Sequence, residues 1–186
     1  RAIDAINPVE IGFDDAITSL LASVGPVGAV GHRVVHGGRD LTTARLVTPD
    51  VEAATRSLTP LAPLHQPRAL AALEGARRAL PDVPHVACFD TAFHTTMPAA
   101  ARTYALPAPW RQQWGLERFG FHGLSHAWAA RRGLAVAGLP DDARVVSCHL
   151  GSGASLCASA GGRSVDTTMG FTPLEGLVMG TRSGDV

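Results

Sequence analysis

The sequence predicts an α/β fold, because apolar runs with the length of strands alternate with a helical pattern. Such runs lie at residues 28–35, 85–90 and 143–150. A helical repeat of leucine and alanine fills residues 67–80, between the first two runs. Glycine pairs at residues 37–38 and 161–162 supply turns. Strands that alternate with helices indicate the α/β class.

The first strand is expected in GAVGHRVVHGG, residues 28–38. Its valines favour a pleated surface, and Gly37-Gly38 permit the positive φ of a turn. Arg33 then lies on or near the end of the strand. A helix is predicted to start at Pro67 and to stop before Pro81. Between these prolines, apolar residues recur at spacings of three and four: Leu70, Leu73, Ala76 and Leu80.

Four further elements follow. HVACFD, residues 85–90, is predicted to be a short strand that ends in Asp90. Ser125 is expected to cap a helix that runs to about Leu134. ARVVSCHL, residues 143–150, is predicted to be a buried strand that delivers His149 into the glycine segment GSGAS. Residues 155–166 are expected to form a hairpin around Gly161-Gly162.

The composition is typical of a globular protein, with 46% hydrophobic and 17% charged residues among 186. A formal net charge of +0 leaves no broad basic surface, so nucleic acid is not expected as a partner. No run approaches the roughly 18 apolar residues of a membrane span, and RAIDAINPVE does not resemble a signal peptide. We therefore expect a cytoplasmic protein without membrane contact. Its three cysteines lack CxxC spacing and are expected to be buried and reduced: Cys88, Cys148 and Cys157.

Seven sequence blocks follow one another in order. They are GHRVVHGG (31–38), LAPLHQP (61–67), FDTAFHTTMP (89–98), TYALP (103–107), FGFHGLSH (119–126), HLGSGAS (149–155) and MGFTPLEGLVMGTRSGD (169–185). Together they resemble the acetate kinase family, from about residue 28 to residue 185. Almost all of them read as loops, where chemistry tends to be placed on a rigid scaffold.

The resemblance implies a fold of two ribonuclease H-like lobes, as in the superfamily of sugar kinases, Hsp70 and actin, with a nucleotide between them. Residues 1–140 are then expected to be the first lobe, on the acetate side and without its opening strand. Residues 141–186 are expected to begin a truncated second lobe, which binds nucleotide. Family members also have an opening phosphate loop, adenosine-binding segments and a metal-site glutamate. The chain is therefore expected to be incomplete at both ends and to contain no metal ligand.

Two arginines are candidates for the chemistry that the resemblance implies. Transfer of a phosphoryl group to a carboxylate brings two anions together, and guanidinium groups neutralise such charge with paired hydrogen bonds. Arg33, in HRVV, is assigned by resemblance to the acetate carboxylate. Arg182, in GTRSGD, is assigned to the transferring phosphoryl group.

Several histidines lie within the blocks. By resemblance, His122 in FGFHG hydrogen-bonds to the phosphoryl oxygens in the transition state. His65 in LAPLHQP matches a histidine near the substrate pocket, although Gln66 replaces the usual asparagine. The other histidines of the blocks include three that we interpret as hydrogen-bond partners that organise loops: His36, His94 and His126.

Asp90, in FDTAFH, matches the family's catalytic aspartate, which is often described as a proton donor or acceptor. A free carboxylic acid has a pKa of roughly 4, so acetate is already ionised at neutral pH and has no proton to lose. We therefore expect Asp90 to orient Arg33 or Arg182, or to hold the magnesium shell. A structural role, in which the carboxylate caps the turn after HVACF, is the alternative.

The segment GSGAS offers closely spaced backbone N–H groups, and its glycines allow phosphate to approach. Leu156 occupies the third glycine position of GxGxxG, so the segment is not the dinucleotide fingerprint. The resemblance makes it a phosphate-binding block for ATP or ADP, with magnesium, or manganese in its place. Ser152 stands where the family normally has asparagine, and a hydroxyl cannot donate two N–H bonds. The expected ATP-binding residues are His149, Leu150, Gly151, Ser152 and Gly153.

Val35 matches a valine that lines the pocket for the substrate methyl group. Relatives that prefer propionate tend to have a smaller residue there, so acetate is favoured. One methylene changes binding by only about 1 to 3 kcal/mol, so the preference is graded. Phe121 and Leu64 are expected to share this wall, and Pro173 to lie close to it. Ordinary core packing is compatible with these positions.

Three other functions are compatible with parts of the sequence. The chain contains eight histidines but no HExxH spacing, which disfavours a metallohydrolase. Residues 123–127 resemble a nucleophile elbow but lack its final glycine and a preceding strand. A truncated kinase lobe that acts as a non-catalytic binding module is a stronger alternative.

The resemblance therefore implies an ATP:acetate phosphotransferase, magnesium-dependent and reversible, which forms acetyl phosphate and ADP and assembles as a homodimer. A kinase for propionate or another short-chain carboxylate is the nearest alternative.

Overall fold

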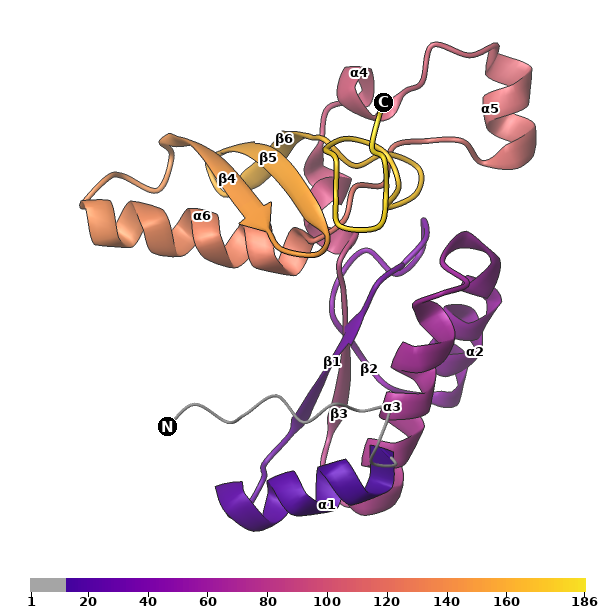
Figure 1. Cartoon of the computed structure of the whole chain (residues 1–186), viewed down its shortest axis with the longest axis vertical. Helices are drawn as coiled ribbons and strands as arrows, with labels where there is room; N and C mark the ends of the chain where they lie inside the picture. Colours follow the sequence, from indigo (N-terminus) through magenta and orange to yellow (C-terminus); the bar gives the residue numbers. More distant parts are fainter. Residues whose placement is uncertain (1–12) are drawn as a thin grey trace. The chain divides into compact units, whose positions relative to one another are not determined.

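The computed structural model describes residues 13–186, and the chain divides into two compact units (Figure 1). The first contains the described residues before Val35 together with Ala44–Cys88. The second contains Val35–Thr43 and Phe89–Val186. Each unit combines helices with a three-stranded sheet, so the predicted α/β class is confirmed. The lobe boundary expected near residue 140 stays a prediction.

The sheet of the first unit has the strand order β1-β3-β2. Its strands are β1 (Val30–Val34), β2 (Arg45–Leu46) and β3 (His85–Phe89), and β2 runs antiparallel to β3. The two longer strands were both predicted. In β1, His32 and Val34 are buried and Arg33 is exposed, as the twofold periodicity of a strand requires.

Three helices and a 3₁₀ turn complete the first unit. They are α1 (Phe13–Val24), α2 (Pro49–Ser57), η1 (Thr59–Leu61) and α3 (Gln66–Ala79). Thr48 caps α2, because its hydroxyl accepts a hydrogen bond from the Val51 N–H at 3.3 Å. Helix α3 lies one residue from the predicted bounds at each end, and its apolar face packs on β1 and on the other two helices.

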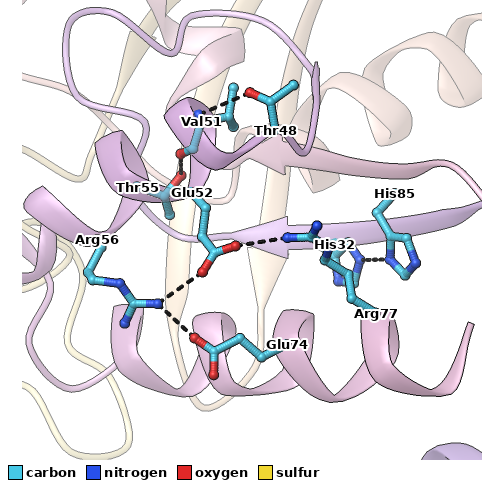
Figure 2. Close-up of polar contacts among 9 residues, drawn as sticks. All are labelled: His32, Thr48, Val51, Glu52, Thr55, Arg56, Glu74, Arg77 and His85. Carbon is cyan, nitrogen blue, oxygen red and sulfur yellow. Dashed lines mark hydrogen bonds and ion pairs between the residues drawn. The ribbon is translucent and has the colours of Figure 1, made fainter. Parts of the chain in front are cut away.

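Exposed charges join α2 to α3 (Figure 2). Glu52 accepts hydrogen bonds from Arg56 at 3.1 Å and from Arg77 at 2.9 Å. Arg56 also contacts Glu74 at 2.7 Å. A buried contact lies beneath this network, where the Gln66 side chain donates to the Thr55 carbonyl at 3.1 Å.

The second unit contains an antiparallel meander, β4 (Arg144–Leu150), β5 (Ala154–Ala160) and β6 (Arg163–Thr167). Gly161 and Gly162 have φ of 54° and 70°, the positive values that a two-residue hairpin turn needs, so the predicted hairpin is confirmed. Helix α6 (Gly123–Ala137) packs against β4. The other elements are η2 (Ala92–Thr96), α4 (Ala99–Arg102) and α5 (Ala108–Trp114).

Two predictions about these elements were wrong. Helix α6 begins at Gly123 rather than after Ser125, because Gly123 packs directly on the carbonyl of Asp90 and fixes the start of the helix. Strand β4 lies at a sheet edge and alternates in burial, so its expected full burial is not seen: Val146 is 68% exposed. Cys148 is exposed for the same reason, whereas Cys157 is buried; Cys88, on β3, is partly buried, and all three cysteines are free.

The core of the second unit forms around Phe119, Phe121 and Met169. Val35, Phe171 and Met179 pack against this aromatic core. The Gly170 carbonyl accepts hydrogen bonds from the N–H groups of residues 119 and 120, both at 3.1 Å. The core therefore joins three of the sequence blocks. No helix in residues 13–186 combines the length and the apolar character that a membrane span requires.

We predict that Gln66→Ala destabilises the protein more than Glu52→Gln. Truncation of Gln66 removes a buried hydrogen bond and the packing of a fully buried side chain, which costs about 0.5 to 3 kcal/mol. An exposed ion pair contributes about 0 to 1 kcal/mol. Urea unfolding measures both, and the effect of Glu52→Gln should fade in 1 M salt. An equal loss in the two variants would contradict this assignment.

We also predict that stability falls as the pH drops from 6.5 to about 4. Burial lowers the pKa of His94 from 6.5 to about 4, so the unfolded chain binds a proton that the folded protein excludes. Urea unfolding against pH should show a slope that His94→Gln reduces, by up to about 1.4 kcal/mol per pH unit. His65→Gln, at an exposed position, is the control. An unchanged slope in His94→Gln would refute the prediction.

Candidate active site

The side chains of Arg182 and His122 meet at Gly153, in the turn between β4 and β5. A Cβ placed on Gly153 would lie 2.7 Å from Nη2 of Arg182 and 3.3 Å from both Cε1 and Nε2 of His122. Any side chain at this position would therefore displace the guanidinium group. Two residues predicted to be catalytic, 60 positions apart in the sequence, are brought together here.

The segment that carries Arg182 is tied to the glycine segment through the backbone. The Gly180 N–H donates to the Ser152 carbonyl at 3.1 Å, and the Met179 N–H donates to the Arg182 carbonyl at 2.9 Å. Nη1 of Arg182 donates to the Pro173 carbonyl at 2.6 Å. Pro173, predicted to lie near the substrate, is thus a direct partner of Arg182.

Tyr104 and Glu175 hold the segment around Pro173. The Tyr104 hydroxyl lies 2.8 Å from both carboxylate oxygens of Glu175 and accepts a hydrogen bond from the Phe171 N–H at 2.6 Å. Burial, and then the hydrogen bond with Glu175, raise the pKa of Tyr104, so the hydroxyl stays protonated and donates to the carboxylate. Gly170 packs against the Glu175 carboxylate, where a Cβ would collide with it. The conformation of this segment is therefore fixed from outside the site.

His122 occupies an unusual backbone conformation at the start of α6. Its φ of 58° and ψ of 20° are left-handed, and it is the non-glycine residue with positive φ among residues 13–186. This conformation costs of order 1 kcal/mol or more, and such strain is concentrated at functional sites. The Gly123 N–H donates to the Asp90 carbonyl at 2.8 Å, so buried Asp90 lies beside His122. All three residues predicted to be catalytic therefore belong to one part of the second unit.

Histidine rings and serine hydroxyls surround the imidazole of His122. Its ring stacks on His149, with centroids 4.0 Å apart. Nδ1 of His122 lies 2.8 Å from the Ser155 hydroxyl, which also lies 2.8 Å from Nε2 of His126. Nδ1 of His149 lies 2.9 Å from the Ser125 hydroxyl. Ser125 lies inside α6, and its hydroxyl contacts His149. It does not directly follow a strand, as the nucleophile of an α/β-hydrolase does.

The residues expected to bind ATP form the turn that leads to Gly153. The Gly151 N–H donates to the Gly153 carbonyl at 3.1 Å. Leu150, Gly151 and Ser152 are exposed, and the Ser152 backbone is held by Gly180. The turn therefore presents polar backbone beside a guanidinium group, an arrangement suited to an anion. Contact with ATP stays a prediction.

The expected substrate residues are divided between the two units. Val35 and Phe121 pack in the aromatic core of the second unit, where Phe121 is fully buried. Arg33, Leu64 and His65 lie in the first unit, and all three are exposed. Their roles in substrate binding stay predictions.

Two of the histidines interpreted as loop organisers make the expected contacts. Nδ1 of His36 accepts a hydrogen bond from the Gly38 N–H at 2.9 Å, and its ring lies edge-on to Phe119. His94 lies 2.9 Å from both the Ser164 hydroxyl and the Phe121 carbonyl. Within residues 13–186, no group of three or more His, Cys, Asp or Glu side chains is placed to hold a metal ion.

Sequence reasoning missed four residues that shape the site: Ser147, Ser155, Tyr104 and Glu175. No helical spacing signals the two serines, because His122 precedes α6 in a left-handed conformation and shares no helix face with His126. Ser147 is buried on β4, which packs against α6, and Ser155 is buried on the adjacent strand β5. Tyr104 and Glu175 are 71 positions apart, and no local pattern relates them.

Comparison with known proteins gives consistent results. The acetate kinase of Deinococcus radiodurans is 52% identical over 181 residues, which cover 94% of this chain and 46% of that protein. The acetate kinase of Synechococcus is 54% identical over 169 residues, covering 90% of this chain and 42% of that protein. The chain thus spans just under half the length of these relatives.

Solved structures show the same relationship. The acetate kinase of Porphyromonas gingivalis superposes with a TM-score of 0.84 and 40% identity, covering 97% of this chain and 47% of that one. A propionate kinase from Francisella tularensis gives a TM-score of 0.85 and 37% identity, covering 93% and 46%. The family profile of the acetokinase family matches residues 9–186. The chain belongs to the acetokinase family.

Proposed function

We propose that the protein is an ATP:acetate phosphotransferase, which reversibly forms acetyl phosphate and ADP and requires Mg²⁺. The observation that carries the proposal is the convergence of Arg182 and His122 at Gly153. A cationic fork and an imidazole beside a glycine turn form a compact site for a phosphoryl group. Membership of the acetokinase family supports acetate as the acceptor.

The proposed step is an in-line displacement. A carboxylate oxygen of acetate forms a bond to the γ-phosphorus of ATP, and the bond to the bridging oxygen breaks, with its electron pair leaving on ADP. Arg182 neutralises charge on the transferring group, His122 hydrogen-bonds to its oxygens, and the 149–153 turn contacts the nucleotide phosphates. No proton has to move, so Asp90 acts by orienting charged groups.

The acetate half of the site is proposed from the matching blocks. Arg33 binds the carboxylate with its guanidinium fork, and His65 and Leu64 border the pocket. Val35 and Phe121 form the apolar wall for the methyl group, with Pro173 beside them. We propose that the enzyme acts in the cytoplasm as a homodimer.

Magnesium, with manganese as its substitute, would screen the nucleotide phosphates when bound. We propose no ligand for it among the described residues, which form no cluster of His, Cys, Asp or Glu that could hold a metal ion. None of the roles proposed for this chain's residues depends on the metal.

A propionate kinase is the second candidate, because the Francisella tularensis structure bears that name. Val35 separates the two candidates through the volume of the methyl pocket. The difference is limited to about 1 to 3 kcal/mol for one methylene. A catalytically silent binding module is the third candidate.

The experiment is to trap acyl phosphates with hydroxylamine, using the full-length enzyme with ATP and acetate, propionate or butyrate. The proposal expects the highest kcat/KM with acetate. A higher value with propionate would favour the second candidate. If no acyl phosphate forms with any of the three carboxylates, the third candidate, a non-catalytic binding module, is favoured.

We predict that Gly153→Ala lowers kcat of the full-length enzyme by at least about tenfold while the fold survives. The added Cβ would lie 2.7 Å from Nη2 of Arg182, so the guanidinium group must move, and small displacements of charged groups are costly in catalysis. Steady-state rates measure the effect, and circular dichroism checks the fold.

Gly133→Ala is the matched control. Nothing lies within 4 Å of a Cβ at Gly133, which is inside α6, so this change should leave kcat intact and slightly stabilise the helix. Equal values of kcat in the Gly153→Ala and Gly133→Ala variants would contradict the assignment of the site to Gly153.

A further inference from the structure

A line of buried side chains connects His122 to the carbonyl of Cys157. The Ser155 hydroxyl lies 2.8 Å from Nδ1 of His122 and 2.8 Å from Nε2 of His126. On the other side of that ring, Nδ1 of His126 lies 2.8 Å from the Ser147 hydroxyl. Ser147 donates to the Cys157 carbonyl at 3.5 Å. The linking residues, Ser155, His126 and Ser147, are each at most 5% exposed.

The carbonyl at the end of the line sets the direction of every hydrogen bond in it. A carbonyl only accepts, so the single proton of the Ser147 hydroxyl points to Cys157. Ser147 must then accept from Nδ1–H of His126. If His126 is neutral, its Nε2 has no proton and accepts the proton of Ser155. Ser155 is left to accept, and the donor is Nδ1–H of His122.

The surroundings of His126 keep its ring neutral. Burial, and then the neighbouring rings of His94 and His149, lower the pKa of His126 to about 4. The ring of His94 lies edge-on at 5.9 Å and that of His149 at 6.3 Å. Its two ring nitrogens contact neutral hydroxyls, and a neutral ring with one donor and one acceptor satisfies both.

We propose that Ser155, His126 and Ser147 are positioning residues that hold a proton on Nδ1 of His122 and thereby commit its Nε2 to the site at Gly153. Nε2 is the nitrogen on that side, 3.3 Å from where a Gly153 Cβ would lie. The catalytic meaning of this proton relay rests on the proposed function. The predicted tautomer of His122 does not depend on the proposed function.

The relay explains how His122 meets a phosphoryl group without turning its ring. With Nδ1–H held by Ser155, a proton taken up at Nε2 forms a cation whose Nε2–H donates to a phosphoryl oxygen. The stacked ring of His149 restrains the plane of the imidazole. In the opposite direction of the relay, neutral His122 would carry its proton on Nε2 instead.

The test is the tautomer of His122, read from ¹⁵N chemical shifts of the ring in histidine-labelled protein above pH 7. The resonance is assigned by its loss in His122→Asn. If the relay holds, Nδ1 of His122 is protonated and its Nε2 is unprotonated. Ser155→Ala should shift the population toward the Nε2–H form, which free histidine prefers in water.

Ser147→Ala tests the direction of the relay, because it removes the group that orients His126. It should leave His122 in a mixture of tautomers. Ser159→Ala is the control: Ser159 is buried on the same face of β5, and its hydroxyl bonds to Val145 outside the relay. An Nε2–H tautomer in the unsubstituted protein, or one unaffected by Ser155→Ala, would overturn the proposal.

Kinetics of the full-length enzyme separate the relay from the proposed function. Ser155→Ala should lower kcat by about tenfold with little change in KM for acetate, as expected for loss of about 1.4 kcal/mol in positioning. If the tautomers respond as expected but no variant forms acyl phosphate, the function is wrong and the relay stands. If the enzyme turns over normally with Ser155→Ala, the relay has no positioning role.

Discussion

The approach of Arg182 and His122 to the α-carbon of Gly153 is the interaction on which the site depends. A glycine is required there because any side chain would occupy the space of the guanidinium group. Placing a cation and an imidazole side by side is unfavourable once the imidazole is protonated. A bound anion relieves that repulsion, which gives the arrangement a physical reason to exist. The fold must therefore hold both groups in place before the anion arrives.

Different parts of the second unit supply this restraint. Tyr104 and Glu175 fix the segment whose Pro173 carbonyl holds Arg182. The left-handed backbone of His122 and the contact of Gly123 with Asp90 fix the start of α6. These contacts join segments that are far apart in sequence, so the strain at His122 is offset by packing elsewhere. Rigid support of this kind is what preorganised electrostatics require.

Local patterns predicted the elements that depend on local interactions. The periodicity of α3, the strands β1 and β3, and the Gly161-Gly162 hairpin all followed from neighbouring residues. The start of α6 and the exposure of β4 did not, because they depend on the Asp90 carbonyl and on which strand lies at the sheet edge. The sequence blocks identified the candidate residues. The serine relay and the contact of Tyr104 with Glu175 appear only in three dimensions.

The central claim is that Arg182 and His122 form one anion site. The most direct measurement is a titration of the ¹⁵N-labelled full-length protein with acetyl phosphate, following the Arg182 guanidinium and His122 ring resonances together. Both resonances are expected to respond with a single dissociation constant, and Gly153→Ala is expected to weaken both responses equally. Independent responses of the two groups would contradict it, as would a response of the first unit's His32 and His85 instead, whose stacked rings lie 2.9 Å apart between Nε2 and Nδ1.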